Sequence, residues 1–238
     1  MYYQSNFGFM TTGVKNLLFA NVAVFLLQWL NPAFMNGIFY QFLPQDYIHQ
    51  FILLTHSSPS GFDSFFGLVP FLSFDKIFLW QFVTYMFLHG GFGHIFFNMF
   101  ALWMFGVELE RTWGTKEFLK FYFLTGIAAG ISTALFNWGA IIPTIGASGA
   151  IYGILAAYAL FFPDRYVYLY LLFPIKMKYL ALILGAIEFL SAYSQDGIAH
   201  VAHLGGMVVG FIYLRHKYRH WGVGQDFFKN FFKKKGPF

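Results

Sequence analysis

Residues 146–163 read GASGAIYGILAAYALFFP, an apolar run that opens with a single serine between glycines. Polar groups inside a membrane are costly, so a serine at the start of such a run suggests chemistry as well as packing. The whole chain is 58% hydrophobic and 11% charged, against roughly 25% charged in soluble domains. Similar runs recur along it, and about 20 apolar residues cross a bilayer as a helix. The sequence therefore predicts a helical membrane protein.

Six apolar segments are expected to span the membrane. They cover residues 15–33, 92–111, 117–137, 147–163, 177–194 and 198–215. A backbone in lipid must satisfy its own hydrogen bonds, and no period-two alternation supports a closed barrel, so the expected fold class is all-α, a polytopic bundle of six transmembrane helices. Residues 34–91 are too broken by proline and glycine to span and too apolar for an aqueous loop. We expect them to form a long, partly membrane-embedded first loop.

The basic residues predict the orientation of the bundle. If both termini are cytoplasmic, every Lys and Arg except Lys76 lies on the inner side. The predicted organisation is a cytoplasmic N-terminus (1–14), a six-helix membrane domain (15–215) and a basic cytoplasmic tail (216–238) facing anionic lipid. The first apolar run lacks a basic leader and a cleavage site, so we expect a retained helix rather than a signal peptide.

The composition also bears on location and partners. The net charge of +5 is explained by this topology and does not indicate a nucleic-acid partner. The compact form without a soluble domain favours a bacterial plasma membrane. The absence of cysteine excludes disulfides and thiol nucleophiles. Nothing in the sequence specifies an oligomeric state.

Polar residues lie near the starts of the second, fourth and sixth predicted helices. They are His94 and Asn98, then Ser148, then His200 and His203. All three helices enter from the outer face, and each residue is within roughly 10 Å of its helix start. We therefore expect these side chains to share one layer below the outer surface, directed into the bundle.

The chemistry of these residues is compatible with acyl transfer. His94 and Asn98 are four apart, so two donors lie on one helix face and could hold an oxyanion, although a helix–helix hydrogen bond is the simpler explanation. Ser148 could likewise only hydrogen-bond within its helix bundle. Gly146 and Gly149 favour reaction, since they let a substrate backbone approach, and the Ser148 N–H could add a third oxyanion donor.

Small residues indicate which helices meet. Gly149 and Gly153 on the fourth helix, and Gly206 and Gly210 on the sixth, form faces that allow close approach. Their contact would put His203 beside Ser148 as a base. His200 lies on a similar face, and spacing alone leaves both histidines open.

Residues 80–215 resemble the rhomboid intramembrane serine proteases. The resemblance is carried by His89, His94-x-x-x-Asn98, Gly-x-Ser-Gly at 146–149 and Ala-His-x-x-Gly-x-x-x-Gly at 202–210. It implies a catalytic dyad of Ser148 and His203, an oxyanion hole of His94, Asn98 and the Ser148 N–H, and no cofactor. The implied supporting residues are Gly146, Gly149, Tyr152, His89, Gly206 and Gly210, with Tyr152 packed on the catalytic imidazole. Glu110 resembles a structural glutamate of the family.

The family resemblance implies an endopeptidase that cleaves transmembrane segments of membrane proteins near the extracytoplasmic side. It also implies a preference for a small residue before the cut. One position departs from the family, which often has Trp-Arg in the first loop where this chain has Trp80 and Gln81. That departure puts the hydrogen bonds of the loop in doubt, not the dyad.

Three other functions were weighed. A metalloprotease could use His89, His94, His200 and His203, but there is no His-Glu-x-x-His, and Glu188 is expected to have no ligand pair near it. A non-catalytic rhomboid-like protein could bind membrane helices for quality control, although the intact serine and histidine argue against it. A channel or transporter is disfavoured because the spans are expected to hold no paired charges.

Overall fold

The computed structural model describes residues 9–30, 32–169, 172–194 and 199–218 of the chain. Each apolar segment of the sequence forms a helix. The six are α1 (Thr12–Leu30), α7 (Phe92–Trp113), α8 (Thr115–Phe136), α9 (Ser148–Phe161), α10 (Met177–Leu190) and α11 (His200–Lys217). The expectation of a predominantly helical fold is confirmed. The ends differ from the predicted ones by a few residues, and the ends of the predicted N- and C-terminal segments (1–8 and 219–238) lie outside the described residues.

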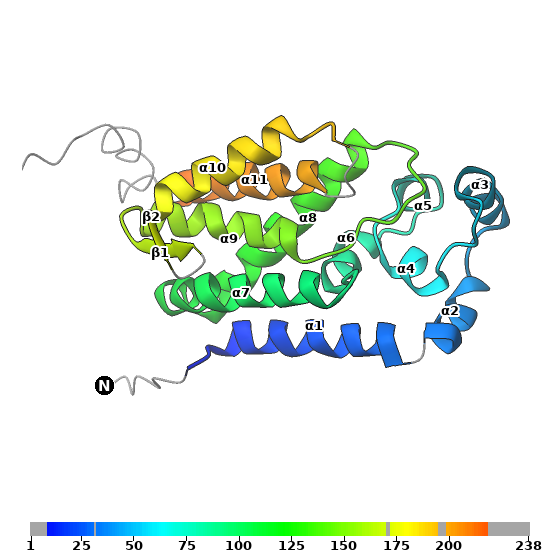
Figure 1. The fold of residues 1–238 in the computed structure, drawn as a ribbon, viewed down its shortest axis with the longest axis horizontal. Helices are drawn as coiled ribbons and strands as arrows, with labels where there is room; N and C mark the ends of the chain where they lie inside the picture. Colours follow the sequence, from blue (N-terminus) through cyan, green and yellow to red (C-terminus); the bar gives the residue numbers. More distant parts are fainter. Residues whose placement is uncertain (1–8, 31, 170–171, 195–198, 219–238) are drawn as a thin grey trace, which may run out of the picture.

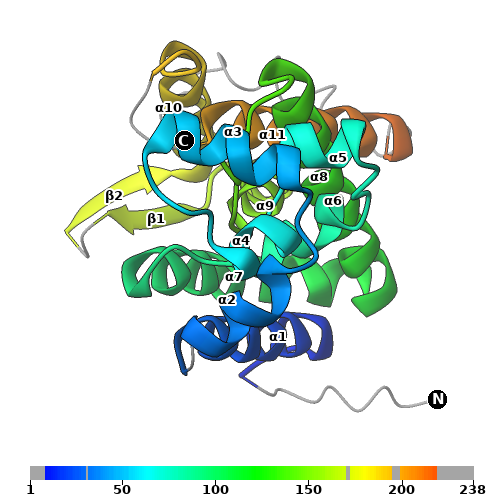
Figure 2. The ribbon, with the colours of Figure 1, turned by 90° about the vertical axis from the view of Figure 1, so that its right-hand side faces the viewer.

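The six long helices alternate in direction (Figure 1). Helices α7, α9 and α11 begin at one end of the bundle, and α1, α8 and α10 begin at the other. The short helices of the first loop gather at the end where α7, α9 and α11 begin, and Figure 2 looks onto that end. The polar residues near the starts of α7, α9 and α11 are thus brought to the same end, beneath the first loop.

One element departs from the all-α expectation. Strands β1 (Tyr166–Leu169) and β2 (Phe173–Lys176) form an antiparallel hairpin between α9 and α10. Val167 pairs with Ile175, and Tyr166 pairs with Lys176. Aromatic and β-branched side chains favour this extended pairing. The strands are too short to produce a recognisable alternation within a chain that is apolar nearly everywhere.

Only some helices are long and apolar enough to cross a membrane alone. Among the described residues α7 and α8 meet that test, and α1 with α2 (Pro32–Tyr40) would add a third as one broken span. The 14 residues of α9 extend for roughly 21 Å, less than the roughly 30 Å of a hydrocarbon core. Six full spans therefore remain a prediction.

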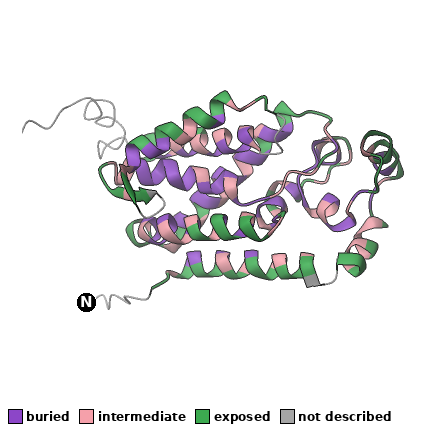
Figure 3. Cartoon of the chain, viewed as in Figure 1, coloured by how far each residue is buried: buried purple, intermediate pink, exposed green. Residues whose placement is uncertain are grey.

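The outer faces of the bundle are apolar. Large side chains such as Phe19 and Trp29 of α1 and Phe189 and Leu190 of α10 are exposed by 65% or more. Figure 3 shows this exposure along both helices, whereas α9 is buried for most of its length. Exposed apolar surface of this extent is what lipid contact requires.

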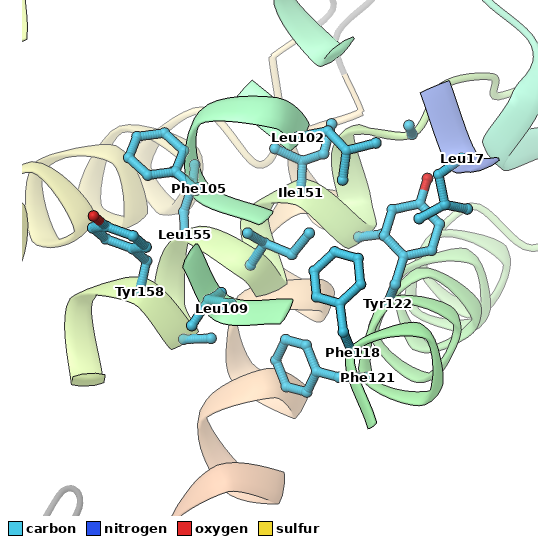
Figure 4. Close-up of a cluster of buried hydrophobic side chains, with 14 of the residues drawn as sticks. Leu17, Leu102, Phe105, Leu109, Phe118, Phe121, Tyr122, Ile151, Leu155 and Tyr158 are labelled. Atoms are coloured by element: carbon cyan, nitrogen blue, oxygen red, sulfur yellow. The ribbon is translucent and has the colours of Figure 1, made fainter. Parts of the chain in front are cut away.

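The core lies between α7, α8 and α9. Aromatic and aliphatic side chains interlock there, as Figure 4 shows for Leu102 and Phe105 of α7, Phe118 of α8, and Ile151 and Leu155 of α9. Lipid tails are as apolar as these side chains, so helices in a bilayer gain from close packing more than from leaving water. The position of α9 in the bundle therefore depends on how closely its side chains fit those of α7 and α8.

Glycine sets the closest approach of α9 and α11. A Cβ added to Gly206 would lie 1.9 Å from the carbonyl oxygen of Gly149. One turn further along the same face of α9, a Cβ at Gly153 would lie 2.6 Å from the Cβ of Thr125 on α8. The predicted contact between small faces of α9 and α11 is found, and α8 also uses the small face of α9. Neither Gly206 nor Gly153 can carry a side chain without moving a helix.

The first loop is more ordered than a broken, loop-like sequence suggests. It contains α2, α3 (Gln45–Thr55), α4 (Gly61–Phe66), α5 (Pro70–Asp75), α6 (Gln81–Thr84) and the 3₁₀ helix η1 (Tyr85–Phe87). Gln81 is fully buried at their centre. Its Oε1 accepts from the Val69 N–H (3.0 Å) and the Ser73 hydroxyl (2.9 Å), and its amide donates to the Ser64 carbonyl (2.8 Å). A neutral amide thus supplies the hydrogen bonds that the departure from Trp-Arg put in doubt.

Glu110 of α7 binds the start of α1 at the opposite end of the bundle. Its carboxylate accepts from the backbone N–H groups of Gly13 and Val14, both at 2.8 Å, and from the hydroxyls of Thr11 and Thr115. Gly13 and Val14 belong to the first turn of α1, whose N–H groups have no intrahelical acceptor. Glu110 therefore caps α1 from α7, a structural role.

Candidate active site

Ser148 is the first residue of α9, placed by a turn that requires glycine. Gly146 has φ +127°, in the region that L side chains rarely adopt, and its N–H donates to the Tyr85 carbonyl at 2.9 Å. A Cβ at Gly146 would lie 2.8 Å from His94 Nε2 and 3.6 Å from Ser148 Oγ. The imidazole and the hydroxyl therefore border the same small volume, which Gly146 keeps open.

His203 lies directly beside the serine. Its Nε2 is 2.7 Å from Ser148 Oγ, within hydrogen-bond distance. The imidazole is 7% exposed, and the ring of Tyr152 stacks on it with centroids 4.2 Å apart and planes 4° apart. Since Gly206 rests on Gly149 close by, the position of His203 follows from the tight packing of α11 on α9.

His94 carries a proton directed toward the volume beside Ser148. Its Nδ1 accepts from the Gly90 N–H at 3.3 Å, so a neutral ring holds its hydrogen on Nε2, the atom nearest Gly146. Asn98 donates one amide hydrogen to the His94 carbonyl at 2.8 Å, and an amide has a second hydrogen to offer. The Ser148 N–H lies in the first turn of α9, where N–H groups lack intrahelical acceptors. The residues that carry these three donors line the same pocket.

These groups share one cavity. It has a volume of about 830 Å³ and is bordered by the connection from α8 to α9 at residues 142–145. Its polar lining includes His94, Asn98, Ser148, His200 and His203. The five residues expected at one depth therefore line one cavity.

Glu188 corrects one sequence-based expectation. The residue is 4% exposed and lies beside both histidines of α11, with Oε2 at 2.5 Å from His200 Nδ1 and 3.1 Å from His203 Nδ1. The Tyr152 hydroxyl donates to Oε1. The expectation that Glu188 has no ligand pair nearby is wrong. Helices α10 and α11 run in opposite directions, so residues equally far from their connection come together.

The same geometry separates the two candidate histidines. His203 presents Nε2 to Ser148, whereas His200 presents Nδ1 to Glu188. The sequence holds a signal for this arrangement, since Glu188 lies two residues before the end of α10 and His200 is the first residue of α11. Composition and hydropathy do not reveal it, because neither measures distance from a helix end.

A profile described as a rhomboid domain matches residues 78–219, more than half of the chain. The chain belongs to the rhomboid family. Rhomboid members are integral membrane proteins, in agreement with the apolar outer faces of the helices. The match begins in the first loop and ends after α11, so it contains all five polar residues of the cavity named above.

Several rhomboid relatives resemble the chain over much of its length. Rhomboid protease GluP from Bacillus subtilis (strain 168) is 32% identical over 133 residues, covering 56% of this chain and 25% of GluP. Rhomboid protein 1, mitochondrial, from Saccharomyces cerevisiae (strain ATCC 204508 / S288c) is 28% identical over 222 residues, covering 87% of this chain and 55% of that protein. Rhomboid protease AarA from Providencia stuartii is 29% identical over 164 residues, covering 59% and 58%. The chain thus spans between a quarter and just over half the length of these rhomboid relatives.

His89, the remaining residue implied by the rhomboid motif, lies outside the cavity wall. Its ring contacts that of His94 edge to face, with centroids 5.0 Å apart, and its backbone N–H donates to Gln28 Oε1 at 3.0 Å. It also borders a pocket of about 170 Å³ together with Asn36 and Asp63. His89 therefore supports the position of His94 and does not reach the serine.

One group in this rhomboid site could hold a metal ion. Glu188, His200 and His203 each offer a ligand atom, and these atoms lie within 4.8 Å of one another. Two imidazoles and a carboxylate are a donor set that suits zinc. An ion there would occupy the Nδ1 atom with which His203 faces Glu188.

Proposed function

We propose that the chain is an intramembrane serine endopeptidase in which Ser148 is the nucleophile and His203 the general base. The observation that carries the proposal is the 2.7 Å contact between Ser148 Oγ and His203 Nε2 in a buried cavity. A serine hydroxyl is a weak nucleophile until an adjacent base takes its proton. A desolvated neutral imidazole is suited to that role.

The proposed reaction has two halves. Ser148 Oγ attacks the scissile carbonyl carbon while its proton moves to His203 Nε2. The tetrahedral intermediate then collapses, the C–N bond breaks, and the new amine leaves with the proton from His203. Water, deprotonated by the same imidazole, next hydrolyses the acyl-serine ester and regenerates the hydroxyl. No cofactor enters either half.

The oxyanion is proposed to bind between α7 and α9. Supporting this, Nε2–H of His94 and the N–H of Ser148 border the same volume, and the second amide hydrogen of Asn98 lines the same cavity. Each such donor contributes typically 10²- to 10³-fold to kcat in acyl-transfer enzymes.

We further propose six spans with cytoplasmic termini in a bacterial plasma membrane and an active site toward the extracytoplasmic face. In support, α7, α9 and α11 start at the same end of the bundle (Figure 1), where residues near their starts line the cavity, while basic residues such as Arg111, Lys116 and Arg165 belong to the opposite end. The substrates proposed are transmembrane segments of other proteins, cut near the outer boundary after a small residue. Two of the relatives above are named as rhomboid proteases and the third as a rhomboid protein, which agrees with this class.

The proposal is tested by quantitative mass spectrometry of shed ectodomains from cells carrying wild type or Ser148→Ala. Wild type is expected to release fragments of single-span proteins that the variant does not release. Equal release by both forms would contradict the proposal. A purified protein that binds a transmembrane segment without turning it over would instead identify a non-catalytic, helix-binding rhomboid.

A further inference from the structure

The buried carboxylate of Glu188 is held from three directions. Tyr152 of α9 donates its hydroxyl to Oε1, and His200 and His203 of α11 approach Oε2 with their Nδ1 atoms at 2.5 and 3.1 Å. A carboxylate removed from water is costly unless donors replace its hydration. Tyr152 and His200 meet that need and fix the carboxylate in place. Its remaining neighbour is the imidazole that contacts Ser148.

Proton accounting gives the contact with His203 a direction. If Nε2 is to accept the Ser148 proton, the neutral ring must carry its hydrogen on Nδ1. That Nδ1 is the atom facing Glu188. The 3.1 Å contact is not aligned as a hydrogen bond in this structure, since Nδ1 has no hydrogen-bond partner of acceptable angle among the described residues. Catalytic hydrogen bonds are often poorly aligned without substrate and tighten in the transition state.

We propose that Glu188 is a positioning residue that extends the Ser148–His203 pair into a Ser–His–Glu relay. It holds His203 in the tautomer with Nε2 free and stabilises the imidazolium that forms when the serine proton arrives. This inference rests on the proposed function. It replaces the two-residue dyad implied by family resemblance with a three-residue arrangement, in which Glu188 touches neither substrate nor the reacting atoms.

Tyr152 and His200 complete the positioning. Tyr152 stacks on the His203 ring and also donates to Glu188, so one side chain sets both the plane of the imidazole and the place of the carboxylate. His200 occupies Oε2 from the other side, which opposes rotation of the carboxylate away from His203. An orienting acid with two restraints of its own is the arrangement that a general base in a serine hydrolase needs.

The test compares Glu188→Gln and Glu188→Asp with wild type on a transmembrane substrate in lipid. Glu188→Gln is expected to lower kcat on the order of 10⁴-fold with KM unchanged, because the tautomer and the imidazolium lose their carboxylate. Glu188→Asp keeps the charge on a side chain one methylene shorter, and its kcat is expected to lie between those of wild type and Glu188→Gln. A matched control is Glu108→Gln, which removes another carboxylate held by a tyrosine, Tyr158, at the far end of the bundle. It should leave kcat unchanged.

A second measurement separates this inference from the proposed function. Nuclear magnetic resonance of ¹⁵N-histidine protein should show a protonated Nδ1 for His203 in wild type, lost or exchanging in Glu188→Gln, and this readout needs no turnover. Wild-type kcat in Glu188→Gln, with Ser148→Ala inactive, would overturn the relay and leave the protease standing. An inactive wild type with the Nδ1 proton in place would overturn the protease and keep Glu188 as the positioning partner of His203. Activity lost on chelation and restored by Zn²⁺ would replace the relay by a metal site.

Discussion

Glu110 and Glu188 are both buried glutamates, exposed by 3% and 4%, yet their surroundings assign them different roles. Glu110 accepts from backbone N–H groups and threonine hydroxyls, none of which acts as an acid or a base near neutral pH. Glu188 accepts from a tyrosine and faces two imidazoles, one of which contacts a serine. A buried carboxylate is therefore interpreted from its donors. Fixed donors make it a cap, and titratable donors make it a candidate for chemistry.

The largest effect should come from removing the base at the Glu188 end. His203→Ala is expected to lower kcat about 10⁴- to 10⁶-fold, as removal of a catalytic histidine does in serine hydrolases. The melting temperature should fall as well, because the substitution removes a buried ring that stacks on Tyr152. Measurement of single-turnover cleavage together with thermal unfolding checks both. Substantial turnover by His203→Ala would assign the base to another residue, with His200 the first to examine.

A smaller fall in kcat is expected from a change in the packing of α11 on α9, which positions His203. Gly206→Ala puts a Cβ 1.9 Å from the Gly149 carbonyl oxygen, so α11 must move away from α9 and take His203 with it. A displacement of about 1 Å can cost on the order of 10²-fold in rate. The matched variant is Gly210→Ala, whose nearest atom would be Phe121 Cζ at 3.1 Å, a contact that a ring can relieve. If Gly210→Ala were as inactive as Gly206→Ala, the close approach at Gly206 would not be the cause.

The Glu110 end should respond in stability rather than rate. Glu110→Gln replaces one accepting carboxylate oxygen by an NH2 group, so two donors face each other at the first turn of α1. The free energy of unfolding is expected to fall by about 2 kcal/mol. The folded enzyme should keep its kcat, because Glu110 is remote from the cavity. Unfolding in a mixed-micelle titration and kcat per labelled active site measure the two quantities. A large fall in kcat would mean that the two glutamates are less distinct than their donors indicate.

The smallest effect is expected at Asp164, an exposed carboxylate that is neither a buried cap nor part of the candidate site. Lys176 and Lys178 hold the pKa of Asp164 below its usual value, and the side chain is 51% exposed. Because the folded pKa is depressed, the stabilisation is present above the unfolded pKa of about 3.9 and is lost as pH falls through the folded pKa. Asp164→Asn should therefore cost at most about 0.5 kcal/mol near pH 7, and the cost should shrink as the pH falls through the folded pKa. A pH-independent difference in melting temperature would point to a role other than this ion pair.

Much of the architecture could be predicted from the sequence, because lipid restricts a backbone to few choices. Apolar length located six helices, and the depth of His94, Ser148 and His203 followed from helix direction. The hairpin at Tyr166–Leu169 and Phe173–Lys176 was missed, since strand periodicity is hidden where almost every residue is apolar. The short helices of the first loop were not predicted, because proline and glycine occur both at helix ends and in irregular loops.

Glu188 shows what patterns along the chain cannot provide. Hydropathy treats it as a lone charge in an apolar helix, and a motif search finds no ligand pair in sequence next to it. Its partners come from two other helices, and only packing brings Tyr152, His200 and His203 to one carboxylate. Gln81 is a similar case, since its buried hydrogen bonds depend on residues 8 to 17 positions away in the chain.

The proposed nucleophile, Ser148, is activated by His203, and both roles can be tested by covalent labelling. The purified protein in lipid is treated with a fluorophosphonate probe, followed by intact-mass and peptide analysis. We expect one adduct, on Ser148, that is absent from Ser148→Ala and forms far more slowly in His203→Ala. Labelling of Ser148→Ala to the wild-type extent, or equal labelling rates with and without His203, would contradict it.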